Sequence, residues 1–268
     1  MKNWINGAFA TFTFEVRRSF SVHRLMVAIG LALFPPAMLN VVGQIAFSRG
    51  SSVAGDVGNN MLFALVFLVA LVCVLMLLLW ATPNVHSELE GKTWHFLVVR
   101  PGGRIACFLG KYLVAVSVSF ATTLVSLAGC VLVVDRYNGL EDPLYTLACL
   151  AGVYGLACIV YGAIFSLIGT IFIKRAMLVG AGFLIGVEGI LAILPAVVSK
   201  VTMSYHLRET GLNWIGWFVP YSKTDYELHF GPPWPVWMHI VSIFVMTAVA
   251  LIAGMIVITN RQYITSEE

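Results

Sequence analysis

Few residues in this sequence could carry chemistry, and they form no catalytic set. Gly91-Lys92-Thr93 matches the end of a nucleotide-binding loop, but His86 stands where that loop needs its first glycine. His86 and His95 lie outside any His-Glu-x-x-His pattern. The serines of the apolar segments have no matched base. We therefore expect no catalytic residue, no metal site and no cofactor bound by this chain.

Glu188 stands apart because it is the only acidic residue well inside a long apolar segment. An ionisable group at the centre of a bilayer costs about 2.5–3.5 kcal/mol, so it should face protein or water. Two interpretations stay open: a polar point on a translocation path, or a carboxyl group hydrogen-bonded across a helix interface. The neighbouring Gly182 and Gly186 favour close approach of another helix. His206, His229 and His239, scattered around an aromatic stretch, are expected to be membrane-interface residues rather than ligands.

The composition indicates the surroundings in which these residues act. Of the 268 residues, 59% are hydrophobic and only 11% are charged, and the mean hydropathy is +0.90. Soluble domains carry about 25% charged residues. The sequence therefore predicts an integral membrane protein in contact with the lipid bilayer. The net charge of +3 is too small to indicate a nucleic-acid partner.

Six apolar segments reach the roughly 20 residues that a membrane-spanning helix needs. The first contains Phe34-Pro35-Pro36, which should kink or break its helix. The fold class is an all-α polytopic membrane protein, with residues 1–268 forming a single transmembrane domain. The predicted spans are residues 25–47, 61–82, 107–134, 145–172, 177–199 and 236–259.

Residues 3–20, within an N-terminal segment 1–23, predict an amphipathic helix that lies in the membrane interface. Its apolar positions recur every fourth residue, while Glu15, Arg17 and Arg18 give it a charged part. The distribution of Lys and Arg indicates the orientation: 11 of the 16 fall on the side of the N-terminus. The positive-inside rule then places both termini in the cytoplasm. The loop 200–235 is expected outside, with short interfacial helices.

The stretch 86–104, between the second and third spans, is the most highly charged connection. Arg100-Pro101-Gly102-Gly103 must turn the chain there, because proline disfavours helix before it and glycine permits a positive φ. A charged, turn-bounded element of this kind is suited to docking a soluble partner. Its candidate contact residues are Glu88, Glu90, Gly91, Lys92, Thr93, Arg100 and Arg104.

These residues resemble the permease subunits of ABC exporters of the ABC-2 type. In that family the loop after the second span has acidic residues, a Glu-x-Gly-Thr-like turn, an apolar helix, Arg-Pro, and Gly-Lys-Tyr at the next span. The matching residues here are Glu88, Glu90-Gly91, Thr93, Phe96-Leu97, Arg100-Pro101, Arg104 and Gly110-Lys111-Tyr112. Glu15-Val16-Arg17 is similar to the Glu-Leu-Arg pattern of the family's N-terminal interfacial helix.

The resemblance implies a permease subunit of the cell inner membrane that pairs with a second copy or a homologue. Two cytoplasmic ATPase subunits would bind ATP and Mg, so the chain itself would not be an enzyme. Residues 86–104 would be the coupling helix, in which Glu88 and Glu90 accept, and Arg100 and Arg104 donate, contacts to the ATPase.

A second hypothesis is a self-sufficient secondary transporter or channel that uses Glu188 and a broken first span. An ATPase that co-purifies with the chain would decide between the two.

Overall fold

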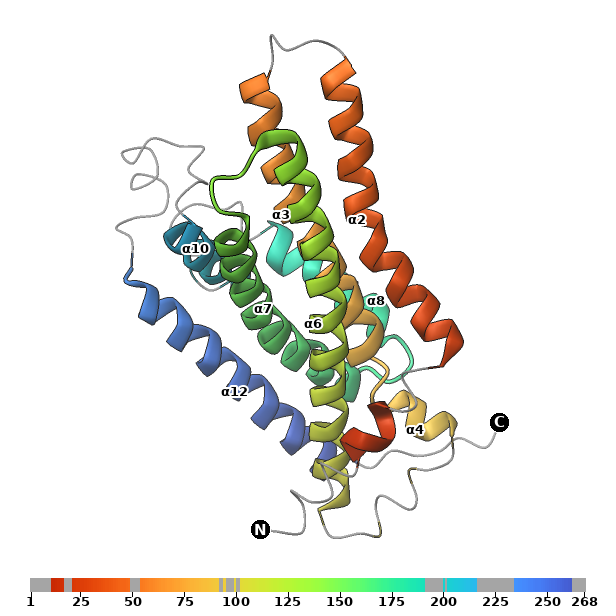
Figure 1. Ribbon diagram of the computed structural model, residues 1–268. Helices are drawn as coiled ribbons and strands as arrows, with labels where there is room; N and C mark the ends of the chain where they lie inside the picture. Colours follow the sequence, from red (N-terminus) through yellow and green to blue (C-terminus); the bar gives the residue numbers. More distant parts are fainter. Residues whose placement is uncertain are drawn as a thin grey trace.

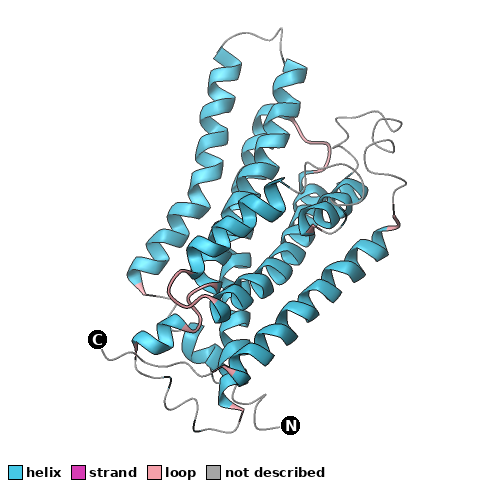
Figure 2. Cartoon of the chain, turned by 180° about the vertical axis from the view of Figure 1, so that it is seen from behind, coloured by secondary structure: helices cyan, strands magenta, loops and turns pink. Residues whose placement is uncertain are grey.

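The computed structural model describes residues 11–16, 21–48, 54–91, 94, 99, 102–190, 200, 202–215 and 234–261. Within these residues every long element is a helix, so the all-α prediction is confirmed (Figure 2). The helices are α2 (Val22–Ser48), α3 (Ala54–Ala81), α4 (His86–Glu90), α6 (Gly103–Asn138), α7 (Pro143–Ile171), α8 (Ala176–Phe183), the π-helical η2 (Leu184–Ile190), α10 (Met203–Ile215) and α12 (Val236–Asn260).

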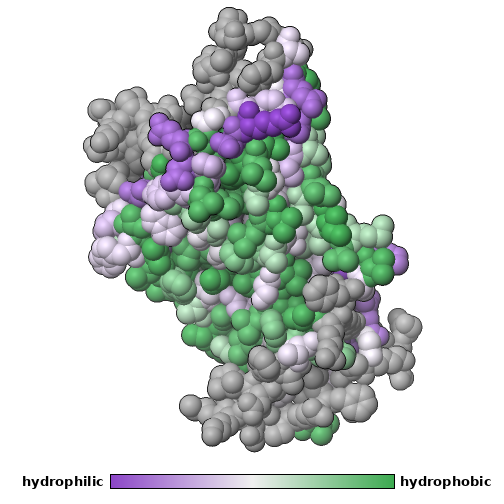
Figure 3. Space-filling view, in the orientation of Figure 1, coloured by the Kyte–Doolittle hydropathy of each residue, from purple (hydrophilic) through white to green (hydrophobic). Residues whose placement is uncertain are grey.

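Five of the described helices are long and apolar enough to cross a membrane: Val22–Ile45, Asn60–Glu90, Gly103–Tyr137, Pro143–Ile171 and Val236–Asn260. They correspond to five of the six predicted spans. The remaining one, 177–199, begins as the shorter apolar helix Ala176–Gly189, and residues 191–199 lie outside the described part. Figure 3 shows a broad hydrophobic belt below a more hydrophilic rim, as an integral membrane protein requires.

The centre of the bundle is formed by α3, α6 and α7, whose side chains Leu65, Leu127 and Phe165 are fully buried. Helix α2 packs against α6 and α3, and α12 packs mainly against α7 (Figure 1). Both flanking helices leave many apolar side chains uncovered, including Leu33 on α2 and Val249 on α12. In a bilayer these faces meet lipid, because apolar side chains there need no protein cover.

Helix α2 continues through Pro35 and Pro36 without interruption. It bends along its length (Figure 1), so the first span is kinked rather than broken. Pro36 packs against α6 at Gly129, where the Cβ atom of any larger residue would lie 3.1 Å from the proline ring. The small residue on α6 therefore makes room for the proline side of the bent helix.

Glycines also set how closely α7 and α8 approach α3. A Cβ at Gly169 of α7 would collide with the backbone carbonyl of Thr82, and one at Gly180 of α8 would lie 2.6 Å from Leu78 Cδ1. The close approach expected at Gly182 and Gly186 is not found among the described residues, where both positions have nothing within 4 Å. The packed glycine of α8 is Gly180, because only that face turns toward α3.

The bundle has two ends that differ in the elements they gather. At the α4 end, Arg104 at the start of α6 donates a hydrogen bond to the Thr259 carbonyl at the end of α12, and Arg261 after α12 donates to the Ile171 carbonyl at the end of α7. At the α10 end, α10 meets the starts of α7 and α12, as the bond from Tyr145 to Trp214 indicates. Figure 1 shows α10 almost end-on while α7 and α12 are seen from the side, so α10 crosses these helices.

Candidate functional site

Lys111, two turns into α6, is the centre of a buried polar cluster at the α4 end. Its side chain is only 5% exposed, and its Nζ lies 2.6 Å from Glu88 Oε1 and 3.6 Å from Glu15 Oε1. Nζ also donates hydrogen bonds to the Asn84 carbonyl at 2.9 Å and to Ser87 Oγ at 2.7 Å. One ammonium group thus joins the N-terminal helical segment, the turn before α4, α4 itself and α6.

Local sequence accounts for this arrangement. Gly102, within the predicted Arg-Pro-Gly-Gly turn, has φ 75°, a left-handed conformation that glycine adopts without strain, and α6 begins at the next residue. On the other side, Asn84 donates a 3.1 Å hydrogen bond to Ser166 Oγ of α7. The loop is therefore fixed to the bundle at α6 and at α7.

Of the predicted coupling residues, Glu88 and Glu90 face opposite ways. Glu88 is buried and paired with Lys111, so its carboxylate serves the interior of the protein rather than a partner. Glu90 is exposed and pairs with His86 at 3.1 Å, and Gly91 after it is also exposed. Lys92, Thr93 and Arg100 lie outside the described residues.

Two arginines close helix ends at the same end of the bundle. Arg104 donates a 2.8 Å hydrogen bond to the Thr259 carbonyl at the end of α12. Arg261 donates to the Thr170 and Ile171 carbonyls at the end of α7. A cation at a helix C-terminus satisfies unpaired carbonyls and the helix dipole. Arg104, predicted as a partner contact, therefore also holds α6 to α12.

The N-terminal segment is described only in part. Residues 11–16 are helical, and Glu15 is buried beside Lys111. Arg17 and Arg18 lie outside the described residues. The predicted amphipathic helix is thus seen in its middle, where its one carboxylate points into the Lys111 cluster.

At the other end, Glu188 holds the start of α10. Its Oε1 accepts a hydrogen bond from the Met203 amide at 3.1 Å, and its Oε2 accepts from the Ser204 amide at 2.9 Å and from the Tyr161 hydroxyl at 3.0 Å. The first amides of a helix have no partner within the helix, and a carboxylate is well suited to them. Of the two interpretations left open by the sequence, this geometry supports a carboxyl group hydrogen-bonded across a helix interface.

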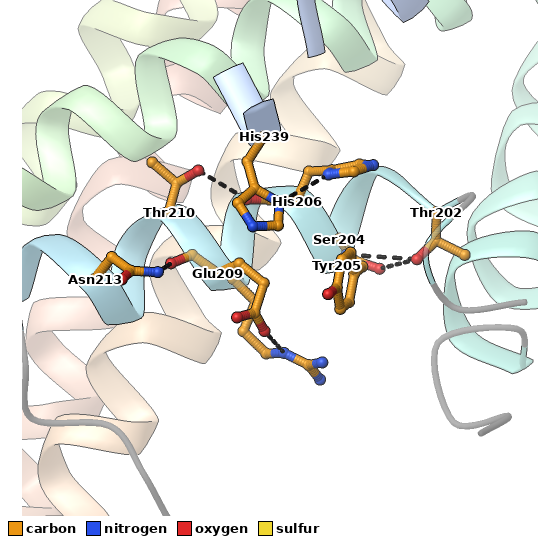
Figure 4. Close-up of polar contacts among 9 residues, drawn as sticks. Thr202, Ser204, Tyr205, His206, Glu209, Thr210, Asn213 and His239 are labelled. Atoms are coloured by element: carbon orange, nitrogen blue, oxygen red, sulfur yellow. Dashed lines mark hydrogen bonds and ion pairs between the residues drawn. The ribbon is translucent and has the colours of Figure 1, made fainter. Parts of the chain in front are cut away.

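Two histidines at the α10 end are buried, in contrast to the interface position expected for them. His206 on α10 and His239 on α12 are 1% and 0% exposed, and their Nδ1 atoms lie 3.0 Å apart (Figure 4). The Tyr205 and Trp234 rings lie against the pair, and Lys200 Nζ lies 5.2 Å from the centroid of Trp234. Sequence reasoning missed this pair because 33 residues separate its members and no local pattern joins them.

Burial shifts the titration of this region. It lowers the pKa of His206, and the neighbouring His239 lowers it further. It raises the pKa of Glu209, against the effect of the Arg208 guanidinium 3.8 Å away. Both side chains are thereby biased toward their neutral forms. In the part of the chain that the structure describes, no three His, Cys, Asp or Glu residues are placed to hold a metal ion.

The family resemblance rests on the motifs around Glu15 and in residues 86–112, and the geometry adds that Glu15, Glu88 and Lys111 from these motifs meet in one cluster. The sequence matches no protein-family model and shows no significant similarity to a curated protein.

Proposed function

We propose that this chain is the transmembrane permease subunit of an ATP-driven ABC exporter of the ABC-2 type. It pairs with a second permease copy or a homologue and couples to two cytoplasmic ATPase subunits, which bind ATP and Mg. The observation that carries the proposal is the buried Lys111, which fastens the loop between two membrane-spanning helices to the N-terminal segment.

A coupling element must move as one body with the helices it drives. In this protein α4 is fastened to α6 through Lys111 and to α7 through Asn84 and Ser166. Charge-assisted hydrogen bonds in a buried site are stronger than exposed ones, so they resist a force that would pull the loop away. A displacement of α4 by the ATPase would be passed to the N-terminal segment, α6 and α7 together.

The surface offered to the ATPase is polar, as a separable interface requires. Glu90, the last residue of α4, is exposed, and the sequence continues with Lys92, Thr93 and Arg100. Glu88 supports this surface from within, through its ion pair with Lys111. The interface thus takes its charge from Glu90 and the residues after it, and its rigidity from Glu88.

In this proposal the α4 end and both termini lie in the cytoplasm, since most lysines and arginines fall on that side. The α10 end then faces the outside. The cytoplasmic membrane is the compartment in which such a permease meets its ATPase.

The alternative, a self-sufficient transporter or channel, relied on a broken first span and on Glu188 as a site for an ion or a substrate. The first span is unbroken, so it provides no unwound backbone for an ion site. Glu188 already accepts three hydrogen bonds from Tyr161, Met203 and Ser204. No observation on the described residues favours this second function.

The test is a double charge reversal, Glu90→Arg with Arg100→Glu, in the full-length chain expressed in its own cells. We expect an ATPase to co-purify with the wild type in mild detergent and to be lost from the double variant. Glu141→Arg, a reversal of an exposed carboxylate at the α10 end, serves as the matched control and should retain the ATPase. Equal retention by the double variant would refute the docking surface, and the absence of any ATPase from the wild type would refute the function.

A further inference from the structure

A hydrogen bond between His206 and His239 connects two helices. Their Nδ1 atoms lie 3.0 Å apart, which is hydrogen-bonding distance, and the two rings come from α10 and α12. A neutral imidazole has one N–H donor and one acceptor nitrogen, so one ring donates through Nδ1 and the other accepts there. The contact exists only while one of the two Nδ1 atoms is without a proton.

The surroundings assign the two roles. His239 Nε2 is buried and has no hydrogen-bond partner among the described residues. A bare lone pair is less costly there than an unpaired N–H, so His239 donates through Nδ1.

An added proton has no good position in this arrangement. On His206 it would go to Nδ1, and two N–H groups would then face each other across 3.0 Å. On His239 it would go to Nε2, where the Nδ1–H···Nδ1 bond persists but a charged donor is buried with no acceptor among the described residues. When both rings are protonated, two charged N–H groups face each other and the contact between α10 and α12 is lost.

The charged and titratable groups around the pair act in both directions. Lys200 adds positive charge beside it, and Arg208 points over Tyr205 on the same helix. Glu188 from η2 favours a charged His206, but its carboxylate is engaged by the α10 amides and by Tyr161 of α7. Glu209 of α10 is buried near Arg208. The pKa of His206 is lowered on balance, which keeps the ring neutral at pH 7.

We propose that His206 and His239 form a pH-sensitive latch, which holds α10 against α12 at neutral pH and releases it on acidification. Other contacts of α10 are independent of these rings: Glu188 holds its first turn, and Tyr145 donates a hydrogen bond to the Trp214 carbonyl at its end. Acidification therefore swings α10 away from α12 without detaching it from α7. This inference goes beyond the coupling to an ATPase and does not depend on it.

The experiment measures the exposure of a buried position on α10 in the full-length chain in detergent. Thr210 is fully buried, and Thr210→Cys is introduced after replacement of the five native cysteines by alanine. Its rate of reaction with a maleimide is divided by that of Asn213→Cys, an exposed position on the same helix. The division removes the intrinsic effect of pH on thiol reactivity.

We expect this ratio to rise about tenfold between about pH 7.5 and about pH 5, the range in which histidine changes its charge. In the double variant His206→Gln with His239→Gln, two amides can bond to each other at every pH, so the ratio should stay low throughout. Protection of Cys at position 210 at neutral pH shows that the double variant is folded. An unchanged ratio in the wild-type pair, or the same rise in the double variant, would refute the latch.

Discussion

Lys111 and Glu88 form an ion pair inside the protein, with Nζ and Oε1 2.6 Å apart and both side chains almost entirely buried. Removing one member of such a pair leaves the other charge without compensation in a medium of low dielectric constant. Lys111→Met should therefore lower the free energy of unfolding by about 3–5 kcal/mol. The measurement is thermal or denaturant unfolding of the purified chain.

The matched control for that prediction is Lys174→Met, which removes an exposed lysine from the turn between α7 and α8 and should change stability little. A second arm combines Lys111→Met with Glu88→Leu, which removes both charges and should recover part of the loss. If the single and double variants are equally unstable, the pair acts through packing and not through charge.

Glu188→Gln should loosen the start of α10. The variant keeps one acceptor oxygen but places an NH₂ group against one of the two backbone amides, Met203 or Ser204, which also donates. An unsatisfied buried donor costs about 1–3 kcal/mol. We expect amide hydrogen exchange in 203–215 to accelerate, by about tenfold for each 1.4 kcal/mol lost.

Tyr161→Phe provides the comparison, because it removes one of the three hydrogen bonds to Glu188 and leaves both amide contacts in place. Its effect on exchange in the same peptide should be smaller. Unchanged exchange in Glu188→Gln would mean that the carboxylate does not hold the helix.

The two glycines Gly169 and Gly182 should respond oppositely to the same substitution. Gly169→Ala drives a methyl group into the backbone of Thr82, which cannot move as a flexible side chain would, so we expect a loss of about 1–3 kcal/mol. Gly182→Ala enters open space on α8 and should be neutral or stabilising by up to about 1 kcal/mol. Melting temperatures of the two variants test this, and a destabilised Gly182→Ala would indicate a neighbour at that face.

Stability should increase as the pH rises through the ordinary pKa of histidine. The pKa of His206 is lowered from 6.5 in the folded protein, so below pH 6.5 the unfolded chain binds more protons than the folded one. The free energy of unfolding therefore falls as the pH drops below that value. Glu209 acts in the opposite direction, because its pKa is raised from 4.5 and the folded protein holds its proton above that pH.

The two contributions are separated by measuring the melting temperature in Glu209→Gln, where only the histidine contribution remains. In that background the melting temperature should rise steadily from about pH 5 to about pH 7. The further change His206→Gln should flatten the rise. A slope that survives this change would assign the dependence to other groups.

The proposed orientation predicts which positions can be labelled from outside. In a background without native cysteines, Asn213→Cys on the exposed side of α10 should react with an impermeant maleimide in intact cells. Glu90→Cys, exposed at the α4 end, should react only after permeabilisation. The reverse pattern would overturn the orientation and with it the cytoplasmic docking of α4.

The sequence by itself determined the all-helical class and the position of five long apolar helices, because both follow from hydropathy over stretches of about 20 residues. The turn at Gly102 and the charged nature of α4 were also readable, since they depend on the types of a few adjacent residues. A proline pair inside α2 predicted a disturbance, but the helix continues through it, and Pro36 packs against α6 at Gly129.

The tertiary structure alone decided which polar groups face inward. Glu88 and Glu90 are two positions apart on a short helix, and roughly 200° of rotation separates them; the one that is buried is the one that Lys111 of another helix can reach. His206 is hydrogen-bonded to His239, and Glu188 to the first amides of α10, and no local sequence pattern predicts either pairing. Buried polar groups must be paired, and partners distant in the chain are chosen by how the helices pack and not by local pattern.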